Sequence, residues 1–187
     1  IVSCAAGKET SFESALAPLG VELAVIGEPE PLGRGGALRF AAQVRKENGD
    51  VYALNGDELL DLDLRALLAR HRESAAAATI TVTRPASAFG VVELGEGDVV
   101  TGFQEAGLLP HWVSCGVYVL GAEALARLPE RGDHERSTFP ELAAERRLRA
   151  YRHDGLWLTV NTPKDLRVAE ELVAANPRWL DSPQPLG

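Results

Sequence analysis

Short apolar segments alternate along the chain with stretches whose apolar residues recur at helical spacing. The apolar runs predict strands, and a period of three to four residues predicts helices. Alternation of the two is typical of α/β proteins. The predicted strands are 21–27, 51–54, 77–83, 90–93, 99–104, 112–120 and 148–153, and the predicted helices are 35–44, one capped by Asp63 that carries Leu64, Leu67, Leu68 and His71, 122–128, 139–146 and 163–175.

This order of elements predicts one α/β domain over residues 1–187, with a doubly wound mixed sheet. The pattern changes after residue 77, where short strands follow one another and a Gly-Glu-Gly-Asp turn at 95–98 joins two of them, and this predicts a lateral β extension in the middle of the domain. The wholly apolar strand 51–54 is expected to be buried on both faces, as in parallel sheets. The tail 176–187 holds three of the 11 prolines and is expected to wrap the surface.

Composition narrows the class of protein. The chain has 187 residues, 45% hydrophobic and 25% charged, as is usual for globular domains. Its net charge of −8 argues against nucleic acid or an anionic membrane as partner. No apolar run approaches the roughly 20 residues that span a bilayer. The first residue is Ile1 and the sequence has no Met, so we expect further sequence upstream.

Cysteine and histidine usage points away from disulfides and zinc. Cys4 and Cys115 form no disulfide framework and lack metal-ligand spacing, and no signal peptide is recognisable. A reducing cytoplasm is therefore the expected compartment. The four histidines show no zinc-ligand spacing either.

The first candidate binding loop runs from residue 28 to residue 38. Its glycines, Gly33, Gly35 and Gly36, allow a ligand to approach the backbone, and the helix that follows is expected to offer N–H groups to an anion. No Gly-Lys-Ser/Thr follows, and Leu38 breaks the G-x-G-x-x-G pattern. Such a glycine-rich turn is, in the alternative, a plain helix start.

The second candidate loop is Asn55-Gly56-Asp57, at the end of a predicted strand. Magnesium takes one or two carboxylates together with substrate phosphates, so Asp57 is a candidate ligand. The alternative is a tight turn with an aspartate cap. Asp61 and Asp63 form a D-x-D pattern, which glycosyltransferases use for metal, but helix capping explains Asp63 more simply.

Six segments together resemble the sugar-1-phosphate nucleotidylyltransferases, and the mannose-1-phosphate guanylyltransferase-like branch in particular. They are EPEPLGRGGALRFA (28–41), VYALNGDELLDLDLRALLARH (51–71), AFGVVEL (88–94), GFQEA (102–106), WVSCGVYVL (112–120) and GLWLTVNTPKDLRVAEEL (155–172). The resemblance covers almost the whole chain. It implies a Rossmann-like three-layer fold that joins a nucleoside triphosphate to a sugar 1-phosphate and releases pyrophosphate, with Mg²⁺ as cofactor.

The same resemblance implies roles for single residues. It assigns nucleotide binding to Glu28, Leu32, Gly33 and Gly36, sugar binding to Gly90, Glu105 and Ser114, and metal binding to Asp57 and Asn161. Asp57 would hold the metal between the α-phosphate and the sugar phosphate. A carboxylate at Glu28 can accept the paired N–H donors of guanine, which favours GTP, although a loop acid at 28 and a surface acid at 105 are the plainer alternatives.

The sequence departs from the family pattern at four points. The family's first strand and its G-G-x-G-T-R-L-x-P-L loop are absent from this sequence. Ala106 stands where the family often has Lys, and Ser114 stands where it has Asn. Thr159 replaces the second metal-binding Asp, so that Asn161 would offer a neutral oxygen ligand, which attracts a dication less strongly.

The sequence therefore supports two functions from different classes. The favoured one is a cytoplasmic, magnesium-dependent nucleotidylyltransferase that uses GTP and mannose 1-phosphate. The alternative is a catalytically weak module of the same fold that binds a nucleotide sugar and acts in regulation, and a D-x-D glycosyltransferase is a weaker third. The residues upstream of Ile1 would discriminate the first two. Oligomeric state cannot be predicted.

Overall fold

The computed structural model describes residues 1–176 and divides the chain into two compact units that interleave along the sequence. The first unit comprises Ile1–Ala53, Leu68–Thr79 and Tyr118–Arg149. The second comprises Leu54–Leu67, Ile80–Val117 and, among the described residues, 150–176. The prediction of a single domain over 1–187 stays a prediction.

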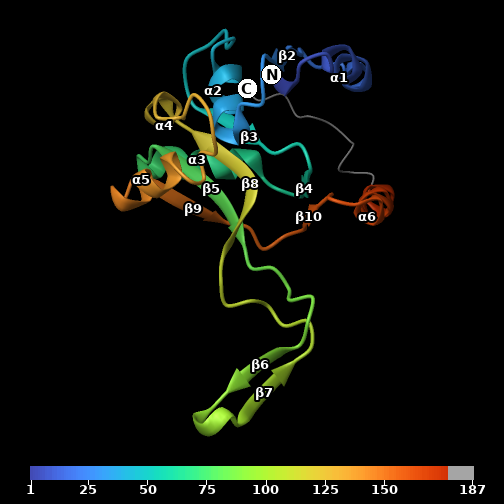
Figure 1. Cartoon of the computed structure of the whole chain (residues 1–187), viewed down its shortest axis with the longest axis vertical. Coiled ribbons are helices and arrows are strands. Elements are labelled where there is room, and N and C mark those ends of the chain that lie inside the picture. Colours follow the sequence, from blue (N-terminus) through green and yellow to red (C-terminus); the bar gives the residue numbers. More distant parts are fainter. Residues whose placement is uncertain (177–187) are drawn as a thin grey trace. The chain divides into compact units, whose positions relative to one another are not determined.

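Helices and strands alternate along the chain, as predicted for an α/β protein (Figure 1). The strands are β1 (Val2–Ala5), β2 (Val25–Glu28), β3 (Val51–Leu54), β4 (Glu58–Leu60), β5 (Ala78–Thr83), β6 (Val91–Leu94), β7 (Val100–Gln104), β8 (Val113–Leu120), β9 (Leu148–Arg152) and β10 (Trp157–Thr159). The α-helices are α1 (Glu9–Leu16), α2 (Gly33–Ala42), α3 (Leu64–Ser74), α4 (Ala122–Ala126), α5 (Thr138–Ala144) and α6 (Pro163–Ala175), and the short 3₁₀ helices are η1 (Ala17–Leu19) and η2 (Glu96–Asp98).

The strands form a four-stranded sheet and three two-stranded sheets. The larger sheet has the order β3-β8-β5-β9. Strands β1 and β2 pair in parallel, whereas β4–β10 and β6–β7 pair antiparallel. The predicted mixed α/β architecture is thus confirmed, and β6–β7, with a register shift at Glu93/Leu94, is the predicted lateral extension.

The first unit has its core around the second half of β8. Val119, Leu120, Leu128 and Leu142 all belong to this unit and are almost fully buried. Tyr118, His134 and Phe139 form a cluster of edge-to-face rings with centroids 4.7–5.2 Å apart. Burial of these side chains anchors α4, α5 and the loop between them.

In the second unit, a proline and a capping box stabilise the first turn of helix α6. Pro163 is at the first helical position, where its missing N–H costs nothing. Thr162 accepts a hydrogen bond from the Asp165 backbone, and the Asp165 carboxylate accepts one from the Thr162 backbone, which makes a capping box. The helix contacts β10, and the sequence prediction of 163–175 is confirmed to the residue.

Most predicted elements are confirmed, with some corrections. The prediction of a strand over 21–27 is wrong for its first four residues, since β2 pairs with β1 only from Val25 onward. Strand β3 is not buried on both faces, because Leu54 is 56% exposed. The prediction missed β1, α1, β4 and β10. The expectation for the tail 176–187 falls on residues that, apart from Asn176, lie outside the described ones.

Candidate functional site

The glycine-rich loop of the first unit is shaped by a second segment of the protein. Gly33 has φ +74°, and a Cβ there would lie 2.9 Å from the Gly132 backbone. A Cβ at Gly35 would lie 2.6 Å from the His134 nitrogen, and one at Gly36 would lie 2.6 Å from the Glu130 carbonyl oxygen. The close approach of residues 130–134 therefore accounts for these glycines without a ligand.

The N-terminus of α2 is already partnered within the protein. The N–H groups of Gly35 and Gly36 donate to the Gly132 carbonyl at 2.8 and 3.2 Å. The Arg34 N–H donates to the Asp133 carboxylate at 3.2 Å, and the hydrogen bonds from Arg34 hold the pKa of that carboxyl below its usual range. The expectation that these N–H groups are offered to an anion is wrong, because a carbonyl and a carboxylate of the chain occupy them.

Glu28 is half-buried and holds the same loop from its other end. One carboxylate oxygen accepts a hydrogen bond from the Leu32 N–H at 3.1 Å, and the other accepts one from the Ser3 hydroxyl at 3.0 Å. Glu28 is therefore not a plain exposed loop acid. Nucleotide binding by Glu28, Leu32, Gly33 and Gly36 stays a prediction. Glu28 ends β2, Leu32 precedes α2, and the two glycines lie in the first turn of α2.

Asp57 lies in the second unit, in the turn between β3 and β4. Its side chain is exposed, and its carbonyl accepts a hydrogen bond from the Val160 N–H at 2.7 Å. Asp57 caps no helix, because strand β4 follows it directly. The bond to Val160 also brings the chain before Asn161 alongside Asp57, so two of the predicted metal ligands belong to adjoining segments.

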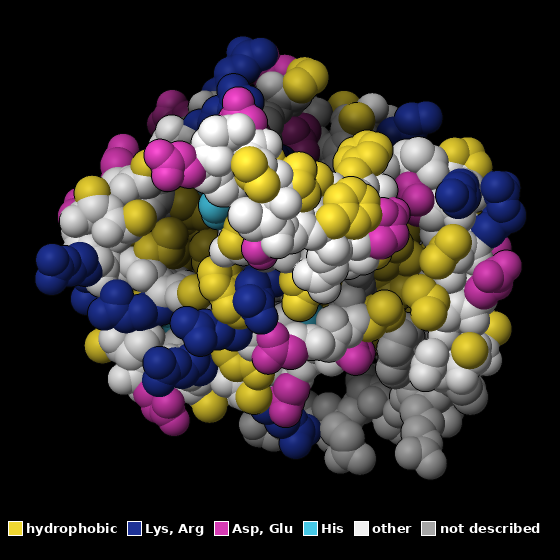
Figure 2. Space-filling model, turned by 90° about the horizontal axis from the view of Figure 1, so that it is seen from below, with side chains coloured by type: hydrophobic (Ala, Val, Ile, Leu, Met, Phe, Trp, Pro, Cys, Tyr) yellow, Lys and Arg dark blue, Asp and Glu magenta, His cyan; other side chains and the backbone are white. Residues whose placement is uncertain are grey.

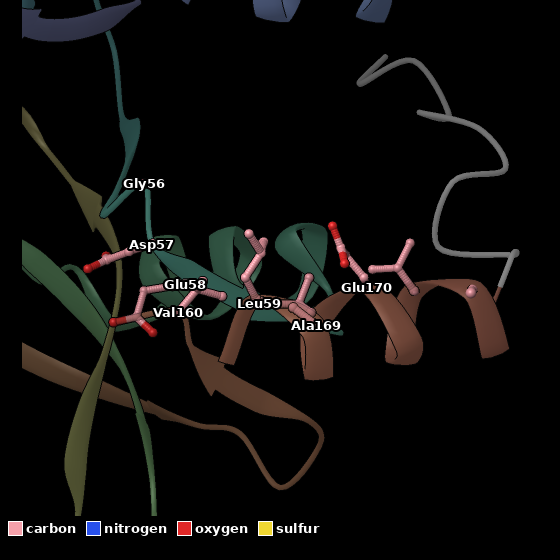
Figure 3. A pocket seen from close by; sticks show the side chains of 10 residues that line it. Gly56, Asp57, Glu58, Leu59, Val160, Ala169 and Glu170 are labelled. Carbon is pink, nitrogen blue, oxygen red and sulfur yellow. The ribbon is translucent and has the colours of Figure 1, made fainter. Parts of the chain in front are cut away.

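Glu58 is a candidate functional residue that the sequence reasoning missed. Its carboxylate accepts hydrogen bonds from Trp157 Nε1 at 2.7 Å and from the Thr159 hydroxyl at 2.9 Å. The carboxylates of Asp57 and Glu58 point to the same side, away from α6 (Figure 3). The signal was present in the sequence, since two consecutive acids follow the turn that ends a strand.

Ser114 is hydrogen-bonded to Gly116, the residue of strand β8 that approaches Glu58. Its hydroxyl accepts a hydrogen bond from the Gly116 N–H at 3.3 Å, and the Gly116 carbonyl accepts one from the Asn55 N–H at 2.9 Å. Gly116 has φ +70°, and a Cβ there would lie 2.9 Å from the Glu58 side chain. The left-handed glycine thus allows strand β8 to approach the turn that carries Asp57 and Glu58.

Burial and a nearby carboxylate also change the pKa of the Cys115 thiol. Burial, with a smaller contribution from the nearby Glu58 carboxylate, raises the pKa of Cys115 to about 12. Both cysteines are free and buried, which confirms the prediction that they form no disulfide. Cys115 is therefore a packed, unreactive thiol.

Gly90 and Glu105 flank the β6–β7 ribbon. The ring of Phe103 covers Gly90, so that a Cβ there would lie 2.4 Å from the ring. Glu105 is exposed and forms no hydrogen bond or ion pair with another residue in 1–176. Sugar binding by either residue stays a prediction.

A hollow of about 610 Å³ adjoins Asp57 and Glu58 on the side of α6. Its walls are mainly apolar, with Leu59 and Val160 on one side and Leu166, Ala169 and Val173 of α6 on the other. Figure 3 shows Leu59 and Ala169 along this hollow, while the two carboxylates turn away from it. Asp57 and Glu58 thus line the same hollow from one end, with their carboxylates turned away from α6.

The carboxylates of Asp57 and Glu58 alone do not make a closed metal site. Within residues 1–176, no group of three or more His, Cys, Asp or Glu side chains is arranged to hold a metal ion. The D-x-D alternative is weakened as well, because Asp63 caps α3 through the Ala66 N–H at 3.0 Å and Asp61 pairs with His153 at 3.1 Å.

No helix in the described part of the chain is long and apolar enough to cross a membrane.

Comparisons with known proteins agree with this architecture. The model of the family described as Nucleotidyl transferase matches residues 3–176. The chain is similar to mannose-1-phosphate guanylyltransferase catalytic subunit beta of Drosophila pseudoobscura pseudoobscura, 29% identical over 172 residues that are 89% of this chain and 46% of the relative. It is similar to mannose-1-phosphate guanyltransferase 2 of Candida glabrata, 29% identical over 78% of this chain and 43% of the relative.

The chain spans less than half the length of these relatives. Among solved structures, HddC from Yersinia pseudotuberculosis superposes with a TM-score of 0.65 at 20% identity, over 91% of this chain and 76% of that one. The same protein complexed with GMP-PN also gives a TM-score of 0.65, at 18% identity, over 88% and 74% of the two chains. These likenesses establish the fold, and the family match over residues 3–176 shows that the chain belongs to the nucleotidyl transferase family.

Proposed function

We propose that this chain is the nucleotidyltransferase part of an enzyme that joins a nucleoside triphosphate to a sugar 1-phosphate. GTP and mannose 1-phosphate are the favoured pair, because the relatives that it resembles carry the names of mannose-1-phosphate guanylyltransferases. The observation that carries the proposal is the pair of carboxylates on Asp57 and Glu58, which follow strand β3 and point to one side in a chain of this family.

The reaction is an in-line displacement at phosphorus. An oxygen of the sugar phosphate forms a bond to the α-phosphorus, the bond from that phosphorus to the β-phosphate oxygen breaks, and pyrophosphate leaves. The protein contributes mainly positioning and charge stabilisation. Two approaching phosphates repel each other, so positive charge between them is the principal requirement.

The donor set at Asp57 fits a magnesium ion. Mg²⁺ is usually held by one or two carboxylates together with water and substrate phosphates, and a closed protein cage is not needed. Asp57 would be the first ligand and Glu58 the second, while Asn161, which follows the Val160 that is hydrogen-bonded to Asp57, would add a neutral oxygen. When bound, the metal would offset the charge of the phosphates. Trp157 and Thr159 orient the Glu58 carboxylate for that role.

The nucleotide is expected to bind through its base at the loop of Glu28, Leu32, Gly33 and Gly36. Because the N–H groups at the start of α2 are taken by Gly132 and Asp133, the phosphates are not expected there. The sugar is expected at Gly90, Glu105 and Ser114. Two free, buried cysteines favour a reducing compartment, for which we propose the cytoplasm.

A binding module with little catalysis is the second candidate. One observation favours it: the side chain at position 159 is a threonine whose hydroxyl donates to Glu58, so the carboxylate expected there is missing. Such a module would bind the nucleotide sugar and release no pyrophosphate.

Pyrophosphate release by the full-length protein tests the enzyme directly. A panel of four nucleoside triphosphates against several hexose 1-phosphates, with and without Mg²⁺, should give its highest turnover with GTP and mannose 1-phosphate. The same protein is titrated with GDP-mannose by calorimetry. If the protein binds GDP-mannose but releases pyrophosphate with no pair of substrates, the binding module replaces the enzyme. If it shows no binding and no turnover, both candidate functions are rejected.

A further inference from the structure

Two arginines and a tryptophan of the second unit form a cluster that the proposed reaction does not use. The guanidinium carbon of Arg84 lies 5.3 Å from the centroid of the Trp112 ring, and that of Arg152 lies 5.0 Å from it. Trp112 is 40% exposed, and both arginines are exposed. We call these three residues the Arg–Trp–Arg cluster.

The two arginines of the Arg–Trp–Arg cluster lie at the ends of strands β5 and β9. The hydrogen bonds from Ala77 to Arg147 and from His153 to Val82 advance in the same direction along both strands, so β5 and β9 run parallel. Arg84 follows the last residue of β5, and Arg152 is the last residue of β9. Both therefore lie at the carboxyl ends of neighbouring parallel strands, which is where α/β sheets bind ligands.

The two positive charges are not neutralised within the described protein. Neither Arg84 nor Arg152 forms an ion pair with a carboxylate in residues 1–176, whereas Arg34, Arg72, Arg127 and Arg147 all do. This is notable in a chain with a net charge of −8. Figure 2 shows Lys and Arg side chains on the surface among Asp and Glu side chains.

The indole explains how the two cations are held but leaves their hydrogen-bond donors unused. A guanidinium over an aromatic face is attracted to the ring and stays planar against it. Its N–H groups remain directed outward in a fork that matches the oxygens of a phosphoryl group. Both guanidinium groups lie within 5.3 Å of the centroid of one ring, so two sets of donors are held in the same small region of the surface.

A ladder connects the cluster to the ribbon that carries the predicted sugar residues. The Leu109 N–H donates to the Pro85 carbonyl, and the Ser87 N–H donates to the Gly107 carbonyl, each at 2.9 Å. Arg84 thus lies at one end of this ladder and Glu105 near the other. A phosphorylated sugar that reaches Glu105 would approach along the same segment.

We propose that Arg84, Trp112 and Arg152 form a phosphoryl-binding site. The phosphoryl group belongs either to a sugar 1-phosphate or to free phosphate or pyrophosphate. The first source rests on the proposed function, whereas the site itself does not.

Direct binding to the chain tests the site without turnover. Wild-type chain, Arg84→Gln/Arg152→Gln and the control Arg167→Gln are titrated with inorganic phosphate, pyrophosphate and mannose 1-phosphate by calorimetry. Arg167 is an exposed arginine of α6 in the same unit, so its replacement removes one charge at a different place. We expect the double variant to bind at least about tenfold more weakly and the control to bind like wild type.

A second readout covers the case in which the double variant fails to fold. Tryptophan fluorescence of the wild-type chain should change on addition of the bound anion, and Trp112→Phe should abolish that change while Arg84→Lys/Arg152→Lys weakens binding less than the glutamines do. Mannose without phosphate should produce no response.

The possible results distinguish a sugar 1-phosphate from a free anion as the ligand, and they test this site independently of the proposed function. Mannose 1-phosphate binding tenfold tighter than phosphate would identify the sugar substrate, and tighter or equal binding of phosphate or pyrophosphate would identify the free anion. No binding of any of the three anions by the wild-type chain, or equal loss in Arg167→Gln, would overturn the proposal. Because no turnover is measured, a failed nucleotidyltransferase assay leaves this result standing.

Discussion

At the scale of single residues, the adjoining carboxylates of Asp57 and Glu58 differ in what holds them. Glu58 is fixed by two hydrogen bonds, from Trp157 and Thr159, whereas the exposed Asp57 is held through its backbone. In the proposed function, the accessible Asp57 would be the first metal ligand, and the hydrogen-bonded Glu58 would be the second, held in a fixed orientation.

Asp57→Asn is expected to lower kcat for pyrophosphate release by roughly 100-fold or more, because it removes a full charge beside the reacting phosphates. The thermal midpoint should stay unchanged, since the side chain is exposed. Asp98→Asn, in the turn of the β6–β7 ribbon, is the matched control and should keep wild-type kcat. Wild-type turnover in Asp57→Asn would place the metal elsewhere.

Thr159→Val is expected to destabilise the chain by about 1 kcal/mol, since Glu58 loses one hydrogen-bond donor while the volume is kept. Thr159→Ser retains the hydroxyl and should stay close to wild type. Urea unfolding of the two variants measures the difference. Equal stability of both would show that the bond to Glu58 contributes nothing.

Cys115 should resist thiol reagents in the folded chain. With a pKa of about 12, only about one thiol in 10⁴ is ionised at pH 8, against about one in ten for an ordinary cysteine. Both thiols should therefore react with a disulfide reagent much more slowly in native protein than in urea. Rapid labelling of Cys115 in native protein would contradict its burial.

At the scale of elements, helix α2 depends on the loop that precedes α5. Gly36→Ala places a Cβ 2.6 Å from the Glu130 carbonyl oxygen, a backbone atom that cannot turn away. We expect a loss of about 1–3 kcal/mol, despite the better helix propensity of alanine. Gly56→Ala, where no atom lies within 4 Å of the new Cβ, is the control. A stability equal to wild type for Gly36→Ala would mean that the loop moves freely.

Local sequence predicted the elements that carry their own signals. Helix α6 was predicted to the residue because Pro163 and an apolar period mark it, and α3 because Asp63 caps it. Strands β4 and β10, three residues each, were missed because they exist only by pairing with each other. Their pairing joins segments about a hundred residues apart, which no local pattern reveals.

The candidate site was predicted only in part for the same reason. The family pattern pointed to Asp57 and to the glycine-rich loop. It gave no hint that Gly132 and Asp133 fill the start of α2, or that Thr159 and Trp157 hold Glu58. These contacts link positions far apart in the sequence, so the structure was needed to find them.

At the scale of the whole molecule, acid should destabilise the fold through buried histidines. Burial lowers the pKa of His134, whose ring nitrogens have no hydrogen-bond partner in residues 1–176, and also that of His71. The folded state then keeps them neutral while the unfolded state takes up protons below about pH 6.5. Stability is therefore full above that pH and falls as the pH drops toward the lowered values.

Thermal unfolding between pH 8 and pH 5 measures this effect. We expect the thermal midpoint to fall by several degrees below pH 6.5. His134→Phe should reduce that fall, because Phe takes up no proton while it keeps the ring packing against Tyr118 and Phe139. The facing charges of Arg34, Asp133 and Glu135 remain in both proteins. An identical pH dependence for both would assign the effect to other groups.

The hydrogen bonds that join the start of α2 to Gly132 and Asp133 have a consequence for how the chain folds. Arg34 and its partner Asp133 are 99 positions apart in sequence, and the neighbouring bonds to Gly132 span a similar stretch. Contacts of such separation form late, because a long loop must close first. During synthesis the glycine-rich turn therefore stays without its partner until the residues around Gly132 have left the ribosome. We expect folding of the first unit to be slow and to depend on the last third of the chain.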